Sequence, residues 1–267
     1  MGLGTVAVTG AAGNIGSVVR RALRGEARCL LLLDRVPLRV EAANEVVHTV
    51  DLRDAAAVEA ALAGADAVLH LGGLADEAPL GQLLDVNVSG THHVLEAARR
   101  TAIPRVVLAG SNRVTGFYPT AHLTGPHEPV RPDGMYGVSK AAVEALGRLY
   151  ADKFGVSVIC LRIGSFEDAP TEPRHLATWL SPRDAVGFCR AALAAPLTTR
   201  FATVYAVSAN TRRFWKLPTE AELAYTPVDD AEAHASRIAG ADVPADPEAP
   251  QAGSYALPES TLRHIRP

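Results

Sequence analysis

Sulfur is scarce in this sequence of 267 residues. The three cysteines, Cys29, Cys160 and Cys189, lie far apart, and their spacing matches neither a zinc site nor a disulfide framework. We therefore expect no metal centre and three reduced, buried thiols. Such thiols are typical of the cytoplasm, which is the location that we predict.

An excess of one charge and long apolar runs are also lacking. The 26 basic and 29 acidic residues nearly balance, at a formal net charge of -3. Proteins that bind nucleic acids usually carry a basic patch, so we expect no nucleic-acid partner. No apolar stretch is long enough to span a membrane, so we expect no membrane partner. Met1 is not followed by a basic segment and a long apolar run, so we expect no signal peptide.

Apolar residues, by contrast, make up 48% of the chain and form alternating strand-like and helical segments. This alternation predicts the α/β class, with a doubly wound, parallel Rossmann-like sheet and helices on both faces. The predicted strands are Thr5–Thr9, Cys29–Leu33, Val46–Val50, Ala67–Leu71, Arg105–Ala109, Ser157–Arg162 and Val204–Ser208. The predicted helices are Ile15–Leu23, Ala55–Ala63, Val86–Arg100, Tyr136–Phe154 and Pro182–Ala194.

The composition changes near Ala239, after which Ala, Pro, Asp and Gly dominate. We predict a single domain over residues 1–238, with small substrate-binding elements at about 112–135 and 164–181. Residues 239–267 are predicted to be an irregular C-terminal tail with little core of its own.

Three glycines follow the first predicted strand. Gly10 allows a tight turn, Gly13 lets the backbone approach a pyrophosphate, and Gly16 lets the next helix pack closely on the strand. The N-terminus of that helix offers free N–H groups and a partial positive charge to phosphates. Because the segment lies between a strand and a helix, it predicts a dinucleotide-binding loop. The residues that we assign to it are Gly10, Gly13, Asn14, Ile15 and Gly16.

Asp34 ends the second predicted strand. A carboxylate there accepts hydrogen bonds from the ribose hydroxyls of NAD and repels the 2′-phosphate of NADP, which favours NAD as the cofactor. Arg35 follows directly and could soften that rejection. His70, in the fourth strand, is at least as well explained as an ordinary strand-end histidine. The other predicted NAD-binding residues lie at the ends of the third and fourth strands: Asp51, Leu52, Leu71, Gly72 and Gly73.

Tyr136 and Lys140 lie four residues apart at the start of a predicted helix, so they share one of its faces. A free tyrosine, with a pKa near 10, is too weak a base at neutral pH. A nearby ammonium and the positive nicotinamide ring favour the phenolate and lower this pKa, so that Tyr136 takes a hydroxyl proton as hydride leaves the same carbon. Ser111, after the fifth strand, is predicted to hold and polarise the reacting oxygen, with Asn112 assisting. The predicted catalytic residues are thus Tyr136, Lys140 and Ser111, of which the first two also contact NAD.

Several longer segments are more specific than the glycine loop. They are Ser111-Asn112, Gly116-Phe117-Tyr118-Pro119, Arg131-Pro132-Asp133-Gly134-Met135-Tyr136-Gly137-Val138-Ser139-Lys140, Arg162-Ile163-Gly164-Ser165, Thr178-Trp179-Leu180-Ser181 and Ser208-Ala209-Asn210. With them the chain, to about Trp215, resembles the extended short-chain dehydrogenase/reductases, the NAD-dependent epimerase/dehydratase family. Within that group it is most similar to the bacterial uronate dehydrogenases.

This resemblance implies an oxidoreductase that uses NAD to oxidise C1 of a cyclic hexuronic acid, such as glucuronate or galacturonate, to an aldarolactone. It also implies a homo-oligomer, formed through the helices that flank the sheet. Arg174 would pair with the sugar carboxylate, since a guanidinium matches a carboxylate in a two-point fork. By position, the residues that would contact the sugar are Ser111, Asn112, Tyr136 and Ser165.

Two positions depart from the family. Ala75 stands where the family has a serine that touches the substrate, and Arg113 stands where it has a histidine. Ala75 removes a hydroxyl group, whereas Arg113 adds a charge beside the reacting carbon. We therefore include Arg113 among the substrate-binding residues, as a second cation that could select a dianionic or phosphorylated sugar or simply face solvent.

Other functions stay open. One is a dehydrogenase or reductase that acts on another small sugar or carbonyl compound. Another is a nucleotide-sugar epimerase or dehydratase, although those relatives usually carry a longer C-terminal substrate domain, and only about a hundred residues follow Phe154 here. A binding protein that senses NAD without catalysis is the third, and such proteins commonly lose the Tyr/Lys pair.

Overall fold

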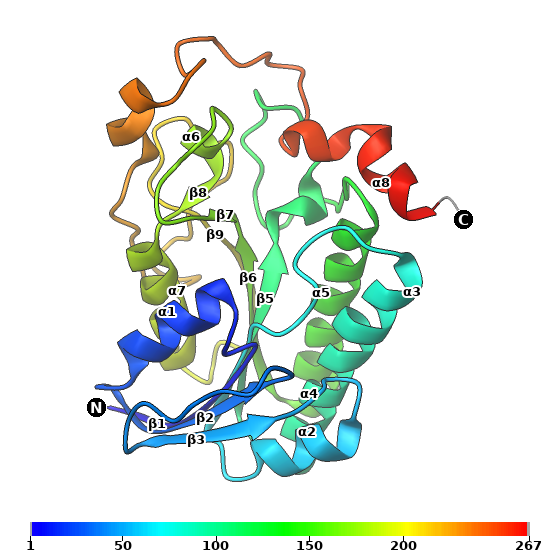
Figure 1. The fold of residues 1–267 in the computed structure, drawn as a ribbon, viewed down its shortest axis with the longest axis vertical. Helices are drawn as coiled ribbons and strands as arrows, with labels where there is room; N and C mark the ends of the chain where they lie inside the picture. Colours follow the sequence, from blue (N-terminus) through cyan, green and yellow to red (C-terminus); the bar gives the residue numbers. More distant parts are fainter. Residues whose placement is uncertain (1, 266–267) are drawn as a thin grey trace.

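A computed structural model describes residues 2–265 and has a parallel seven-stranded sheet at its centre, in the order β3-β2-β1-β4-β5-β6-β9 (Figure 1). The strand order reverses between β1 and β4, and ligands of doubly wound sheets bind outside the carboxyl ends of the strands at such a point. The strands are β1 (Leu3–Thr9), β2 (Ala27–Asp34), β3 (Glu45–Thr49), β4 (Ala67–His70), β5 (Arg105–Ser111), β6 (Ser157–Ile163) and β9 (Phe201–Ala206).

Helices cover both faces of this sheet (Figure 1). Helices α1 (Asn14–Leu23) and α7 (Pro182–Ala194) lie against one face, and α2 (Ala55–Leu62), α4 (Gly90–Arg100) and α5 (Met135–Phe154) against the other. The buried apolar side chains accordingly form two large clusters, one on each face. The predicted doubly wound architecture is confirmed, and the continuous apolar strands are explained by burial on both sides.

The helix predicted over Val86–Arg100 is longer in the structure. Helical turns begin with α3 (Leu80–Leu83), continue as a π-helical turn over Leu84–Ser89 and end with α4. The π-helical turn shifts the apolar spacing away from the period of 3.6 residues, so the earlier turns did not show in the sequence. It also brings the side chain of Asn87 into the interior, where it is 1% exposed.

The last strand of the sheet begins and ends earlier than predicted. We predicted it over Val204–Ser208, whereas β9 spans Phe201–Ala206 and pairs with β6 from Phe201 to Ala206. Its first two residues, Phe201 and Ala202, are half-buried, and Thr203 interrupts the apolar run at the start of the strand. The smaller elements, which the sequence did not predict, are β7 (Ser165–Phe166), α6 (His175–Thr178), β8 (Trp179–Leu180) and the 3-10 turns Asn112–Thr115, Ala231–Arg237 and Gly253–Ala256.

The prediction of an irregular tail after Ala239 is wrong for its second half, because the chain forms α8 (Pro258–Ile265). The segment before this helix is held by Gln251, which is 1% exposed. Its side chain accepts a hydrogen bond from Trp215 Nε1 (2.8 Å) and donates to the carbonyl oxygens of Pro119 (3.1 Å) and His122 (2.8 Å). A buried amide with all these partners anchors the tail to the main body, and composition alone does not reveal it.

No helix among residues 2–265 combines the length and the apolar character that a membrane span needs.

Candidate active site

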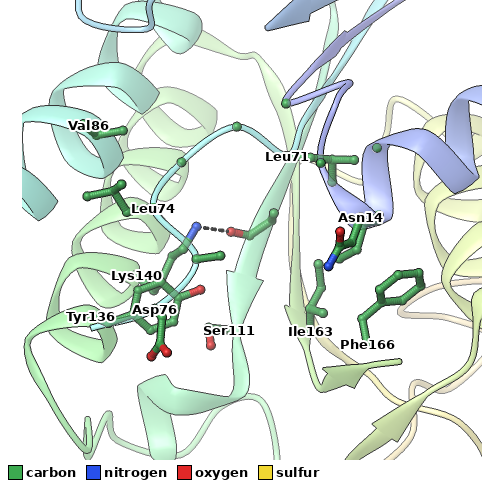
Figure 2. Close-up of a pocket in the computed structure, with 18 of the residues that line it drawn as sticks. Asn14, Leu71, Leu74, Asp76, Val86, Ser111, Tyr136, Lys140, Ile163 and Phe166 are labelled. Atoms are coloured by element: carbon green, nitrogen blue, oxygen red, sulfur yellow. Dashed lines mark hydrogen bonds between the residues drawn. The ribbon is translucent and has the colours of Figure 1, made fainter. Parts of the chain in front are cut away.

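A cavity of about 1050 Å³ lies at the carboxyl ends of the strands. It is large for a ligand site. Figure 2 shows Tyr136, Lys140 and Ser111 on one side of it and Asn14, Ile163 and Phe166 on the other. The structure brings all the predicted site residues to the walls of this one cavity: Gly10, Gly13, Asn14, Ile15, Gly16, Asp34, Asp51, Leu52, Leu71, Gly72, Gly73, Ser111, Asn112, Arg113, Tyr136, Lys140, Ser165 and Arg174.

Two glycines of the loop, Gly10 and Gly16, have no room for a side chain. Gly10 has a φ of +68°, and a Cβ atom there would lie 2.7 Å from the backbone nitrogen of Gly72. A Cβ atom on Gly16 would lie 2.1 Å from the carbonyl oxygen of Gly10. No side chain caps the N-terminus of α1, whose N-cap residue is Gly13. A tight turn at these glycines, followed by a helix N-terminus without a side-chain cap, fits the pyrophosphate of a dinucleotide.

Asp34 is held in place by the loops beside it. Its Oδ2 atom accepts a hydrogen bond from the N–H of Ala12 (2.9 Å), and its Oδ1 atom accepts one from Val36 (3.0 Å). The carboxylate therefore has a fixed orientation at the cavity wall. Farther along this wall, hydrogen bonds from Arg53 lower the pKa of Asp51 to about 2. Asp51 is thus negative at neutral pH, where it disfavours an additional phosphate.

Tyr136 and Lys140 lie on the first turns of α5 and are almost fully buried. The Nζ atom of Lys140 donates a hydrogen bond to the carbonyl oxygen of Ala109 on β5 (2.9 Å; Figure 2) and lies 5.7 Å from the centroid of the Tyr136 ring. Ser111 ends β5, beside Tyr136. The sheet and the helix together therefore fix a hydroxyl, a phenol and an ammonium at the same end of the cavity.

Without NAD, the pKa of Tyr136 is high. Lys140 and the nicotinamide ring were expected to lower it together, whereas burial raises the pKa of Tyr136 to about 12 in the protein alone. The Ser111 hydroxyl and the Arg113 guanidinium only partly oppose this rise. Burial also lowers the pKa of Lys140 to about 8. The ammonium does not by itself outweigh the cost of a buried phenolate, because burial penalises both charged forms.

Arg174 is fixed by two oxygen atoms. Its Nε atom donates to the carbonyl oxygen of Gln251 (3.1 Å), and its Nη1 atom donates to the hydroxyl of Ser165 (3.3 Å). The hydroxyl of Ser165 is in turn hydrogen-bonded to that of Thr178 (2.8 Å). These contacts leave part of the guanidinium fork directed to the cavity that it lines, where a carboxylate matches it.

Arg113 also lines the cavity, but the expectation of a second cation for the substrate is wrong. Its side chain is 7% exposed, and its guanidinium donates hydrogen bonds to Asp133 (2.7 Å), Asp76 (2.9 Å) and Glu77 (3.2 Å). The ring of Tyr255 covers it, with the centroid 4.2 Å from Arg113 Cζ. Three carboxylates already compensate this charge, so it is not free for a substrate anion.

The sequence did not identify Glu77, Asn87, Asp133 and Tyr255 as parts of this region. Glu77 accepts hydrogen bonds from the first N–H groups of α5, although 58 residues separate it from Met135. Asn87 binds both the N–H and the carbonyl of Leu74 and so fixes the loop after β4. Tyr255 comes from the segment predicted to be irregular. Asp133 belongs to one of the segments that carry the family resemblance, but only contacts between distant parts of the chain reveal what these four residues do.

His70 does not line the cavity. Its ring is hydrogen-bonded to the hydroxyls of Thr9 (2.7 Å) and Thr91 (3.0 Å), and burial lowers its pKa to about 3. The ring is therefore neutral at physiological pH and serves to hold β1, β4 and α4 together, as an ordinary strand-end histidine does.

The chain is similar in sequence and in fold to known proteins. A model of the "NAD dependent epimerase/dehydratase family" matches residues 6–183. A uronate dehydrogenase of Agrobacterium fabrum is 42% identical over 240 residues, which cover 90% of each chain.

Two crystal structures have the same fold over almost the whole chain. One is a variant of the uronate dehydrogenase from Agrobacterium tumefaciens complexed with NAD, with a TM-score of 0.89 and 40% identity over 95% of this chain and 97% of that one. The other is a glucuronic acid dehydrogenase from Chromohalobacter salexigens, with a TM-score of 0.89 and 36% identity over 95% and 97% of the two chains. The glycine loop, the Tyr/Lys helix and these matches together show that the chain belongs to the NAD dependent epimerase/dehydratase family.

Proposed function

We propose that this protein is an NAD-dependent uronate dehydrogenase, which oxidises C1 of a cyclic hexuronic acid such as glucuronate or galacturonate to an aldarolactone. One observation carries the proposal: Arg174, a guanidinium fixed by Gln251 and Ser165, lines the same cavity as Tyr136 and Lys140. A carboxylate on the sugar is the group that such a fork recognises. The similarity to uronate dehydrogenases over nine-tenths of the chain supports the same substrate class.

In this proposal the glycine loop binds the pyrophosphate of NAD, and Asp34 binds the adenosine ribose. The clashes that any Cβ atom would cause at Gly10 and Gly16 support the first assignment, and the backbone-held carboxylate supports the second. NAD would supply the hydride acceptor for C1 and a positive charge that favours the phenolate of Tyr136. The rest of the dinucleotide is proposed to lie against Asn14, Ile15, Asp51, Leu52, Leu71, Gly72 and Gly73.

Tyr136 is the proposed base. Its phenolate takes the proton of the C1 hydroxyl as the hydride leaves that carbon. Ser111 and Asn112 hold the same oxygen and so keep the hydroxyl within reach of the phenol. Lys140, whose ammonium is fixed by Ala109, favours the phenolate once a second positive charge lies beside it.

Arg174 and Ser165 are proposed to bind the C6 carboxylate of the sugar. This contact fixes which carbon faces Tyr136, because C6 is attached to C5 and only the ring oxygen separates C5 from C1. The cavity therefore selects both the substrate class and the position that is oxidised. The three free thiols fit a reducing compartment, and the cytoplasm and a homo-oligomer remain proposals.

The experiment is to incubate the protein with NAD and to follow NADH absorbance over a panel of sugars. The panel pairs each uronate with its neutral counterpart, glucuronate with glucose and galacturonate with galactose, and adds glucose 6-phosphate and UDP-glucose. We expect NADH with the uronates and at least a hundredfold lower kcat/KM with the neutral sugars. A conversion of the UDP-sugar without net NADH would instead identify an epimerase, and turnover of neutral or phosphorylated sugars alone would identify another sugar dehydrogenase.

A further inference from the structure

Arg113 lies between two aromatic rings from distant parts of the chain. Its Cζ atom is 4.2 Å from the ring centroid of Tyr255, in the C-terminal segment, and 5.3 Å from that of Tyr136, on α5. A guanidinium over an aromatic ring is held by the ring quadrupole as well as by contact area. Arg113 therefore connects the C-terminal segment to the helix that carries the proposed base.

A second connection runs through Glu77. Its carboxylate accepts hydrogen bonds from the N–H groups of Met135 (2.6 Å) and Tyr136 (3.2 Å), and from Arg113 Nη2 (3.2 Å). The N-cap residue of α5, Gly134, has no side chain to satisfy these N–H groups, so Glu77 does so from outside the helix. The position of the first turn of α5 thus depends on a carboxylate that Arg113 holds.

The C-terminal segment also contacts the other arginine of the cavity. Gly253 has a φ of +60°, and a Cβ atom there would lie 2.9 Å from Cδ of Arg174. The carbonyl oxygen of Gln251 accepts a hydrogen bond from Arg174, and Thr261 of α8 donates to Glu77 (3.4 Å). A segment that composition predicts to be irregular therefore reaches both ends of the proposed substrate site.

We propose that Arg113 is a positioning residue, which links Tyr255 of the C-terminal segment to the first turn of α5 and thereby fixes the hydroxyl of Tyr136 for proton transfer. The catalytic consequence rests on the proposed function, whereas the mechanical link does not. Arg113 is enclosed by Asp76, Glu77 and Asp133, which compensate its charge and orient its fork, so its task is to hold groups in place and not to bind a substrate anion.

The link is tested at Tyr255, because a neutral residue in place of Arg113 would leave Glu77 and Asp133 buried without a cation and could unfold the protein. Tyr255→Leu removes the ring and leaves every charge in place. Arg113→Lys keeps the charge and loses the fork. Phe154→Leu is the matched control, since Arg99 lies over the Phe154 ring (5.3 Å) at the far end of α5, outside the cavity.

Two readouts are measured on the full chain. Hydrogen–deuterium exchange of a peptide that covers residues 133–140 reports the first turn of α5 without any substrate. Steady-state kinetics with NAD and glucuronate, normalised to the number of NAD-binding sites, report catalysis. For Tyr255→Leu we expect exchange about fivefold faster and kcat about tenfold lower, with the Kd for NAD unchanged. Arg113→Lys should lower kcat in the same way, and the double variant should be no worse than the poorer single variant.

Unchanged hydrogen–deuterium exchange of residues 133–140 in Tyr255→Leu would overturn the link. An equally large increase of this exchange in the control variant Phe154→Leu would also overturn it. Faster exchange with an unchanged kcat would show that the link plays no role in catalysis. The same conclusion would follow if the losses of kcat in the two single variants multiplied in the double variant. If exchange rises as expected but the unaltered protein oxidises no uronate, the link holds and the proposed substrate fails. The two proposals are thus separated by the same set of measurements.

Discussion

The Nζ atom of Lys140 donates a hydrogen bond to the carbonyl oxygen of Ala109 at 2.9 Å and lies 5.7 Å from the ring centroid of Tyr136. The ammonium is therefore fixed by the backbone of the central sheet, one helical turn from the phenol. Burial acts on both groups, since it raises the pKa of Tyr136 to about 12 and lowers that of Lys140 to about 8. The pair thus lies in a buried site, where each charge is costly and electrostatic interactions are strong.

Tyr136→Phe removes the proposed base and keeps the ring. We expect kcat with glucuronate to fall by about a thousandfold, because proton transfer by a positioned group contributes about two to four orders of magnitude. NAD binding should change less than twofold, since the glycine loop and Asp34 are untouched. NADH formation and NAD titration measure the two effects, and a variant that keeps more than a tenth of the kcat would show that another group takes the proton.

Lys140→Met removes the buried charge at nearly constant volume. The pKa of Lys140 is lower in the folded protein, at about 8, than its ordinary value of 10.5. The unfolded chain therefore binds more protons between about pH 8 and pH 10.5, and the contribution of this group to stability rises with pH across that window. Below pH 8 the buried ammonium destabilises the fold in full. We expect the variant to be inactive and yet about 2 kcal/mol more stable at pH 7 in the absence of NAD, allowing for the lost hydrogen bond to Ala109.

Urea unfolding at a series of pH values checks this prediction, with Lys153→Met on the exposed end of α5 as the control. The stability difference between the unaltered protein and Lys140→Met should shrink as the pH rises from 8 to 10.5. A variant that is less stable at pH 7, or a difference that does not depend on pH, would contradict the cost assigned to the buried ammonium.

Arg174→Lys keeps a cation and loses the two-point fork. We expect KM for glucuronate to rise about thirtyfold and KM for a slowly oxidised neutral sugar to stay within about twofold, because only the carboxylate uses the guanidinium. Arg183→Lys, which changes an exposed arginine paired with Asp229, is the control. Equal changes of KM for acid and neutral sugars would show that Arg174 does not recognise the carboxylate.

Asp34→Asn tests the preference for NAD. The amide keeps one acceptor oxygen but loses the charge that repels a 2′-phosphate. We expect the ratio of kcat/KM for NAD to that for NADP to fall about tenfold, which corresponds to roughly 1.4 kcal/mol of lost repulsion near the protein surface. Initial rates with both cofactors at saturating glucuronate give this ratio. An unchanged ratio would show that another group, such as Arg35, determines the selectivity between NAD and NADP.

The sequence predicted those parts of the protein that local patterns encode. Strands with continuous apolar runs, the glycine loop and the spacing of Tyr136 and Lys140 depend on neighbouring residues, and the structure has them where the sequence indicates. The sequence did not show the π-helical turn around Asn87, which changes the helical period, or the start of β9, where Thr203 interrupts the apolar run. The role of Arg113 could not be predicted correctly, because the carboxylates that bind its guanidinium lie 20 to 37 residues away in the sequence. Tyr255 and α8 were missed because one buried glutamine, not an apolar stripe, anchors them.

The most direct test of the account follows the hydrogen on C1. Glucuronate that carries deuterium at C1 is oxidised with NAD, and the NADH formed is analysed by mass spectrometry. The account predicts that the deuterium is found in the NADH and that an aldarolactone appears in equal amount. NADH without deuterium, or sugar product still deuterated at C1, would contradict oxidation at that carbon.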